Sequence, residues 1–136
     1  MQIRLFMKVL LVEDDNITGH IMMKVMEGLG YEPLWYTNGA EALAWIEVNP
    51  CQIVISDWMM PGLDGIELCK KIRALKLPIY TYFILLTAKI PVSEGCKVLA
   101  TGVDAFISKP LDKKSLVAKL NVAQSIIRNS HPAQVA

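Results

Sequence analysis

Short runs of β-branched and aliphatic residues alternate along this chain with stretches in which apolar residues recur at helical spacing. Five such pairs of predicted strand and helix occupy the 136 residues, and no linker or low-complexity segment separates them. Strands that alternate strictly with helices are joined by right-handed crossovers, which makes the sheet parallel and covers both of its faces with helices. The pattern therefore predicts an α/β fold built on a five-stranded parallel sheet.

The predicted strands differ in how strongly the sequence indicates them. The run at 79–86 is the strongest because it is nearly all apolar, as expected for a strand that helices cover on both faces. The run at 33–36 is the weakest. In chain order the predicted strands are Val9–Val12, Pro33–Tyr36, Ile53–Ser56, Ile79–Leu86 and Asp104–Ile107.

The helices between these strands are predicted from apolar spacing and from signals at their ends. Met22 and Met26 recur at helical spacing in the first helix, and Gly30 follows where a C-terminal glycine belongs. Asn38 and Asp64 are each followed three residues later by glutamate, which is the pattern of a capping box at a helix start.

Two further helices are predicted towards the C-terminus. The segment 92–101 is a poor helix because Gly95 lies inside it. The segment 112–128 is a better one, and its spacing turns three apolar residues towards the core, namely Leu116, Leu120 and Ile127.

The length of the chain fits one domain, which we place at residues 7–128, with a polar tail at 129–136. With 53% hydrophobic and 20% charged residues, the composition indicates a packed core and excludes a disordered chain. The net charge of +1 gives no support for binding to nucleic acid or to an anionic membrane surface. No apolar stretch approaches the roughly 20 residues that a membrane span needs.

The cysteines and the N-terminus bear on where the protein works. Cys51, Cys69 and Cys96 form no CxxC pair, and an odd number does not suit a disulfide framework, so reduced thiols are expected. The N-terminus reaches Asp14 and Asp15 too early for a signal peptide and has no small-residue cleavage site. We therefore expect a soluble, cytoplasmic protein.

Polar side chains gather at the carboxyl ends of the predicted strands. They are Glu13, Asp14 and Asp15 after the first strand, Asp57 after the third, Thr87 after the fourth and Lys109 after the fifth. Each has an ordinary explanation when taken alone, such as a helix cap for the acidic pair or a turn for Asp57. Ligands of parallel sheets bind at this edge, however, where the strand order reverses. Their convergence from four strands therefore favours a functional site.

The residue types suit phosphoryl transfer assisted by a metal ion. Crowded carboxylates repel one another unless a cation lies among them, and carboxylate oxygens favour Mg²⁺. Lys109 supplies a positive charge and Thr87 a hydroxyl for the oxygens of a phosphoryl group. Asp57 stands alone at the central strand end, so it is the best candidate for the nucleophile. The sequence has no glycine-rich phosphate loop, and a nucleotide is therefore not the indicated ligand.

Four segments resemble the receiver domains of bacterial two-component response regulators. The resemblance covers residues 7–128, and the segments are VLLVEDD at 9–15, DWMMPGLDG at 57–65, LLTA at 85–88 and GVDAFISKP at 102–110. It implies a flavodoxin-like sheet with strand order 2-1-3-4-5. It also implies a signalling switch and not an enzyme with a separate substrate, because receivers catalyse only their own phosphorylation and dephosphorylation.

The resemblance implies a magnesium site around the phosphoacceptor. By position, Asp57 resembles the aspartate that accepts the phosphoryl group. Asp14 and Asp15 resemble the pair that binds Mg²⁺, and Asp57 and the backbone carbonyl of Met59 are implied as further ligands.

The resemblance also implies a switch. Thr87 resembles the residue whose hydroxyl follows the phosphoryl group, and Phe106 the aromatic residue that turns inward as the threonine moves. Lys109 resembles the lysine that binds the phosphoryl group, and the family has a cis bond to the following Pro110, an isomer that costs little before proline.

Two positions in this family tune hydrolysis of the acyl phosphate, and here they are Met59 and Lys89. An apolar Met and a long Lys hinder the approach of water to phosphorus, so we expect a long-lived phosphorylated state. The chain departs from the family at Ala105, where a second acidic residue often follows, and over 90–101, which is unlike the regular helix usual there. These departures concern the output surface.

The partners implied by the resemblance are a sensor histidine kinase or phosphotransfer protein as phosphodonor and a downstream effector domain or protein. The output face comprises the fourth helix, fifth strand and fifth helix, and it would also permit a homodimer. Direct binding to nucleic acid or membrane is not expected. The sequence leaves open whether the chain stands alone or is part of a longer protein, and it does not specify the cognate kinase or output pathway.

Two alternatives remain open. A hydrolase of the phosphatase or dehalogenase type would use the same Asp57 and Mg²⁺, but such enzymes usually carry a second acid where this chain has Met59. A receiver-like scaffold would bind partners without phosphorylation. Such scaffolds typically lose the acceptor, an acidic residue or the lysine, and this sequence keeps all of them.

Overall fold

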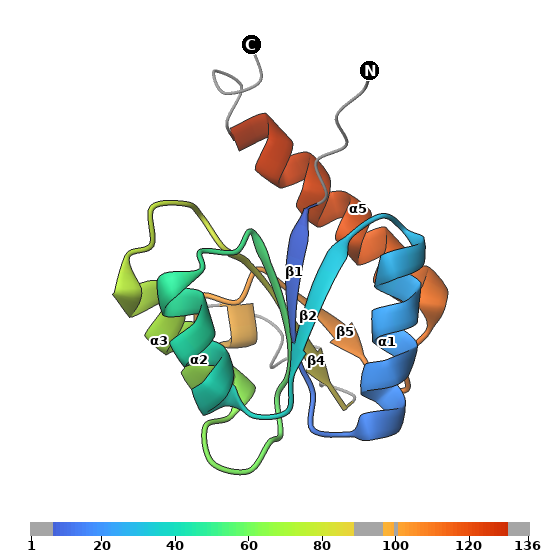
Figure 1. Ribbon diagram of the computed structural model, residues 1–136, viewed down its shortest axis with the longest axis horizontal. Coiled ribbons are helices and arrows are strands. Elements are labelled where there is room, and N and C mark those ends of the chain that lie inside the picture. Colours follow the sequence, from blue (N-terminus) through green and yellow to red (C-terminus); the bar gives the residue numbers. More distant parts are fainter. Residues whose placement is uncertain (1–6, 89–96, 100, 131–136) are drawn as a thin grey trace.

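A parallel sheet of five strands forms the centre of the protein in the computed structural model, which describes residues 7–88, 97–99 and 101–130 (Figure 1). The strand order is β2-β1-β3-β4-β5, so the expected fold class and sheet order are confirmed. The strands are β1 (Lys8–Val12), β2 (Glu32–Tyr36), β3 (Ile53–Asp57), β4 (Tyr82–Thr87) and β5 (Ala105–Ser108).

Helices cover both faces of the sheet. α1 (Asn16–Gly28) and α5 (Lys113–Ser130) lie on one face, and α2 (Gly39–Val48) and α3 (Gly65–Leu75) lie on the other (Figure 1). The helix expected at 92–101 falls mostly outside the described residues, although 97–99 are helical. α5 extends to Ser130, so Asn129 and Ser130, which we expected in the polar tail, belong to this helix.

Each face of the sheet buries its own hydrophobic core, because successive strand residues point to opposite faces. Along β1, Val9 and Leu11 pack with the α1 and α5 side, whereas Leu10 and Val12 pack with the α2 and α3 side. The inward residues predicted for the last helix are buried there, namely Leu116, Leu120 and Ile127. Burial of apolar side chains on both faces stabilises a sheet that carries polar groups only at its ends.

The predicted starts of α2 and α3 are confirmed by their hydrogen bonds. The Asp64 carboxylate accepts from the Glu67 backbone N–H at 2.8 Å, and Glu67 accepts in return from the Asp64 N–H, which completes a capping box before α3. Asn38 accepts from the Glu41 N–H at 2.9 Å at the start of α2. Gly30 follows α1 with a φ of 90°, which glycine adopts without strain.

β4 begins at Tyr82 and not at Ile79 as we expected from the apolar run. Hydrogen bonds that involve side chains hold Thr81, the residue before Tyr82. The Thr81 carbonyl accepts from Arg73 at 2.6 Å, and the Thr81 hydroxyl donates to the Cys51 carbonyl at 2.8 Å. Apolar composition alone cannot separate such a packed loop from a strand.

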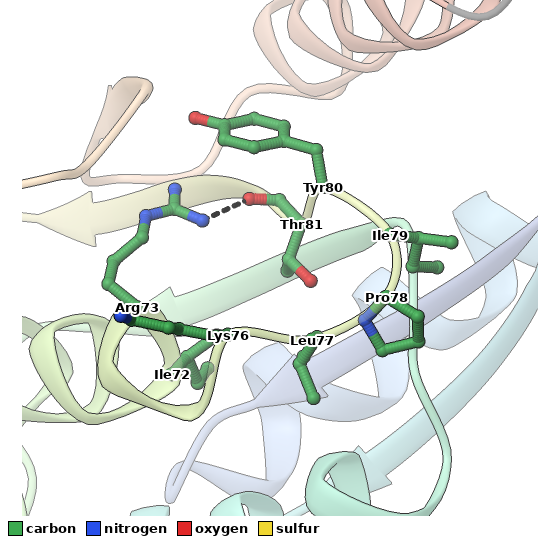
Figure 2. A pocket seen from close by; sticks show the side chains of 8 residues that line it. All are labelled: Ile72, Arg73, Lys76, Leu77, Pro78, Ile79, Tyr80 and Thr81. Atoms are coloured by element: carbon green, nitrogen blue, oxygen red, sulfur yellow. Dashed lines mark hydrogen bonds between the residues drawn. The ribbon is translucent and has the colours of Figure 1, made fainter.

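A cavity of about 270 Å³ lies at the amino end of β4, beside the C-terminus of α3 (Figure 2). Figure 2 shows Arg73 pointing across to the backbone of Thr81. The same guanidinium donates to the Gly102 carbonyl at 2.8 Å and pairs with Asp104 at 2.9 Å, and it lies 4.8 Å from the centre of the Tyr80 ring. The hydrogen bonds and ion pair of the Arg73 guanidinium are thus made to other parts of the protein, and we assign Arg73 the role of holding the loop before β4.

Within the part of the chain that the structure describes, no helix combines the length and the apolar character required to cross a bilayer.

Candidate functional site

Asp57 is the last residue of β3, the central strand, and its side chain lies at the carboxyl edge of the sheet. It is only 6% exposed. Backbone bonds hold the loop that follows, because the Trp58 N–H donates to the Leu86 carbonyl at 2.9 Å and the Gly65 N–H donates to the Trp58 carbonyl at 2.9 Å. The carboxylate is therefore presented from a rigid strand end and not from a free loop.

Lys109 follows β5 and reaches over this edge to Asp57. Its Nζ lies 3.0 Å from Asp57 Oδ2 and 3.3 Å from Glu13 Oε1. The Lys109 N–H donates to the Thr87 carbonyl at 2.7 Å, which places the lysine beside the end of β4, and its peptide bond to Pro110 is cis as expected. The ammonium group thus bridges two carboxylates that come from different strands.

Three carboxylates meet at this point. Oxygen atoms of Glu13, Asp14 and Asp57 lie within 4.8 Å of one another, with Glu13 and Asp57 buried and Asp14 exposed. All-oxygen donors at this spacing fit a hard divalent cation such as Mg²⁺, which prefers carboxylates and retains several water molecules. The group therefore fits the metal that the sequence chemistry suggested.

Asp15, which we expected in the metal-binding pair, lies outside this group of carboxylates. It is the N-cap of α1, and its Oδ2 accepts from the Thr18 N–H at 2.8 Å and from the Thr18 hydroxyl at 2.6 Å. The two bonds from Thr18 lower the pKa of Asp15. Its carboxylate is occupied by the helix start, so the acidic pair beside Asp57 is Glu13 and Asp14 and not Asp14 and Asp15.

Sequence reasoning noted Glu13 at the strand end but did not assign it to the metal pair. The start of α1 is the sequence signal that distinguishes Asp15, which caps the helix, from Glu13, which belongs to the group of carboxylates. An aspartate directly before the first helical residue is a preferred N-cap, and here that residue is Asp15.

The electrostatics of the group reflect its crowding. Burial raises the pKa of Glu13 to about 7, and the hydrogen bond with Asp57 and the negative charge of Asp57 act in the same direction, while the charge of Lys109 opposes them. For Lys109, burial would lower the pKa, but the hydrogen bond to Asp57 and the charges of Glu13 and Asp57 outweigh it, so the pKa is raised. The lysine therefore stays charged, whereas the crowding disfavours the charged form of Glu13.

The two expected switch residues lie on neighbouring strands. Thr87 ends β4, is nearly buried, and donates its hydroxyl to the Ala88 carbonyl at 2.9 Å. Phe106 lies within β5 opposite Leu85 of β4, half-buried against the core under α2 and α3. The Met59 side chain is 75% exposed, and Lys89 lies outside the described residues.

The sequence is similar to those of a known protein family over most of its length. Residues 9–121 match the model of the family described as the response regulator receiver domain. The phosphate regulon transcriptional regulatory protein PhoB of Rhizobium meliloti is 33% identical over 129 residues, which are 92% of this chain and 54% of that protein. Response regulator RppA of Synechocystis is 34% identical over 122 residues, which are 87% of this chain and 50% of that protein. The chain spans about half the length of the curated relatives that it matches.

Solved structures share this fold over most of the chain. Chemotaxis protein CheY4 of Vibrio cholerae has a TM-score of 0.81 at 26% identity, covering 88% of this chain and 99% of that one. The receiver domain of the Francisella response regulator 1452 has a TM-score of 0.78 at 31% identity, covering 85% of this chain and 94% of that one. The family match over most of the sequence, the sheet order and the acidic edge agree, and this chain belongs to the response regulator receiver domain family.

Proposed function

We propose that this receiver domain is a switch that accepts a phosphoryl group on Asp57, with Mg²⁺, from a sensor histidine kinase or a phosphotransfer protein. One observation carries the proposal. The Asp57 carboxylate lies at the central strand end, 3.0 Å from the Lys109 ammonium and beside the carboxylates of Glu13 and Asp14.

Three carboxylates would hold the metal, namely Glu13, Asp14 and Asp57, and we propose the Met59 backbone carbonyl as a further ligand. Mg²⁺ at this place would offset negative charge on the oxygens of the phosphoryl group. Asp15 is left out of this proposal because its carboxylate caps α1.

The transfer itself needs a nucleophile and a positive charge from the protein. An oxygen of Asp57 attacks phosphorus in line, a P–O bond forms as the P–N bond to the donor histidine breaks, and the electron pair leaves with the imidazole nitrogen. Lys109 Nζ then exchanges its contact with the Asp57 carboxylate for one with a phosphoryl oxygen. The ion pair between Lys109 and Asp57 supports this role, because it holds the ammonium close to the oxygens that would carry the phosphoryl group.

The output is a change of binding surface and not turnover of a separate substrate. We propose that the Thr87 hydroxyl leaves the Ala88 carbonyl to bond the phosphoryl group and that Phe106 turns inward, which shifts the population between two packings of one face. β5 and α5 belong to this face, which would bind an effector domain or protein, or a second copy of the chain. We place the protein in the cytoplasm, in keeping with the free thiols of Cys51 and Cys69.

Labelling with a small phosphodonor tests this function. With Mg²⁺ and radiolabelled acetyl phosphate, the wild-type chain should take up about one phosphoryl group per molecule, because a single acyl phosphate forms. Asp57→Asn should abolish the label. Asp64→Asn is the matched control, since Asn still caps α3 and the label should persist.

The same experiment separates the alternatives. Release of many phosphate ions per protein molecule without accumulation of stably labelled protein would indicate a hydrolase of the phosphatase type. A chain that takes up no label with Mg²⁺ would be a scaffold that binds partners without phosphorylation.

A further inference from the structure

Trp35 of β2 binds the backbone that joins the two acids of the site. Its indole Nε1–H donates to the Glu13 carbonyl oxygen at 2.8 Å. This carbonyl belongs to the peptide unit between Glu13 and Asp14. The Glu13 N–H donates in turn to the Tyr36 carbonyl at 3.1 Å, so β2 holds the Glu13 backbone through both of its polar groups.

The indole ring reaches this place because α1 has a glycine beneath it. A Cβ atom at Gly19 would lie 2.1 Å from Trp35 Cζ2, a distance that no side chain tolerates. The neighbouring His20 meets the indole edge-on, with 5.0 Å between ring centres and an interplanar angle of 79°. Glycine lowers helix propensity, so a glycine at position 19 inside α1 is explained by the space that the Trp35 ring needs.

The position of the Asp14 carboxylate depends on the backbone more than the position of the Glu13 carboxylate does. Glu13 is fully buried and is contacted by Lys109, whereas the Asp14 side chain is exposed. Packing therefore does little to place the Asp14 carboxylate, and the orientation of its preceding peptide unit decides where it lies. The Trp35 side chain bonds to that peptide unit.

We propose that Trp35 is a positioning residue for the acidic pair, which acts through its hydrogen bond to the Glu13 carbonyl and holds Asp14 beside Asp57 for metal binding. Trp35 contacts neither the phosphoryl group nor the metal. The inference rests on the proposed function, because it assigns Trp35 a role at the same magnesium site.

Two matched variants test the inference by calorimetric titration with Mg²⁺. Trp35→Phe keeps an aromatic ring against Gly19 but removes the N–H donor. Trp45→Phe removes a half-buried indole from α2, where Trp45 packs against Tyr36, and serves as the control. Loss of one hydrogen bond that orients a ligand should weaken Mg²⁺ binding roughly three- to tenfold in Trp35→Phe. The control should bind as the wild type does.

Thermal unfolding without Mg²⁺ is measured for both variants, so that lost packing is separated from lost positioning. An affinity in Trp35→Phe equal to that of Trp45→Phe would overturn the proposal, whatever the two stabilities are.

A measurement on the wild-type protein keeps the proposal testable if Trp35→Phe does not fold. In a ¹⁵N-labelled sample, the Trp35 indole N–H resonance should shift during a Mg²⁺ titration together with the Asp14 amide, while the Trp45 indole stays in place. An Asp14 amide that moves without Trp35 contradicts the positioning role alone. If neither resonance moves, the chain binds no Mg²⁺ at this site, and the proposed function fails together with the inference.

Discussion

Asp14 and Asp15 are adjacent and carry the same side chain, yet the fold uses them differently. Asp15 precedes the first residue of α1 and caps the helix through Thr18, whereas Asp14 points to Glu13 and Asp57. A carboxylate that already accepts two hydrogen bonds from one helix start is poorly placed to ligate a metal as well. The difference is one of backbone position and not of side-chain chemistry.

Substituting each of the two aspartates tests this division. Asp14→Asn should weaken Mg²⁺ binding by roughly tenfold or more, because a charged ligand is lost. Asp15→Asn should bind Mg²⁺ as the wild type does, since Asn also caps a helix, whereas Asp15→Ala should lower the Tm because the Thr18 N–H loses its acceptor. Calorimetry and thermal unfolding provide the measurements. A loss of affinity in Asp15→Asn as large as in Asp14→Asn would return Asp15 to the metal pair.

Met59 provides a second prediction at the scale of a residue. Its side chain is exposed in the loop directly after Asp57 and offers no group that could bind a water molecule. Met59→Asn introduces an amide that can orient water towards phosphorus, so the half-life of phosphorylated Asp57 should shorten. The half-life is measured from the decay of radiolabelled protein. An unchanged half-life in both Met59→Asn and Lys89→Glu would show that these positions do not tune hydrolysis.

At the scale of elements, α3 packs directly on the backbone of Asp57. A Cβ atom at Gly65, the first residue of α3, would lie 2.3 Å from the Asp57 carbonyl oxygen and 2.8 Å from Leu85 Cδ1. The helix start, the end of β3 and the middle of β4 thus meet without space for a side chain. The site is therefore rigid at its base.

A pair of glycine substitutions tests this close packing. Gly65→Ala should destabilise the protein by about 1–3 kcal/mol, because backbone atoms must move to admit the methyl group. Gly28→Ala, at a position in α1 with nothing within 4 Å, should instead stabilise it by up to about 1 kcal/mol through helix propensity. Urea denaturation measures both free energies of unfolding. Equal effects in the two variants would mean that α3 can shift away from Asp57 at little cost.

At the opposite end of the sheet, Arg73 stabilises the packing by linking α3 to the loop before β4 and to the start of β5. Arg73→Met keeps much of the apolar stem but leaves the Thr81 and Gly102 carbonyls and the Asp104 carboxylate without this donor. We expect a loss of about 2–4 kcal/mol in the free energy of unfolding. Lys76→Met, on the wall of the same cavity, should change it by less than about 0.5 kcal/mol. Chemical denaturation that gave the same small change for both variants would exclude this role for Arg73.

At the scale of the whole molecule, a cation bound at the acidic edge would link metal binding to folding. The carboxylates of Glu13, Asp14 and Asp57 come together only in the folded chain, because they stand at the ends of two different strands. A cation that binds them therefore stabilises the folded state.

This linkage predicts that Mg²⁺ raises the unfolding temperature of the entire domain. At a concentration 100 times its Kd, Mg²⁺ should add about 2.7 kcal/mol to the free energy of unfolding, and a chelator should reverse the effect. Asp14→Asn, which should bind Mg²⁺ at least tenfold more weakly, should show at most about half of this stabilisation at the same concentration. Calorimetric unfolding of both proteins with and without Mg²⁺ measures this stabilisation. An equal increase in the free energy of unfolding of Asp14→Asn would mean that the cation binds elsewhere on the molecule.

The elements and the candidate site were predictable to different degrees. Apolar runs and end signals located all five strands, and the capping pattern at Asp64 was confirmed, because these features depend on neighbouring residues. The predicted start of β4 was wrong, because β4 begins at Tyr82. Residues 79–81 have a strand-like composition, but the Thr81 carbonyl accepts a hydrogen bond from Arg73. Periodicity did not specify the order of the strands, which came from the family resemblance.

Residue type and local spacing were therefore enough to predict the α/β class, the caps of α2 and α3 and the set of polar residues at one edge of the sheet. The folded structure was needed to choose among those residues: it placed Glu13 beside Asp57, left Asp15 on α1 and brought Trp35 to the Glu13 carbonyl across 22 residues of sequence. The reason is physical. Caps and periodic faces arise within a few residues of backbone, whereas contacts between side chains from different strands depend on how the sheet and its helices pack.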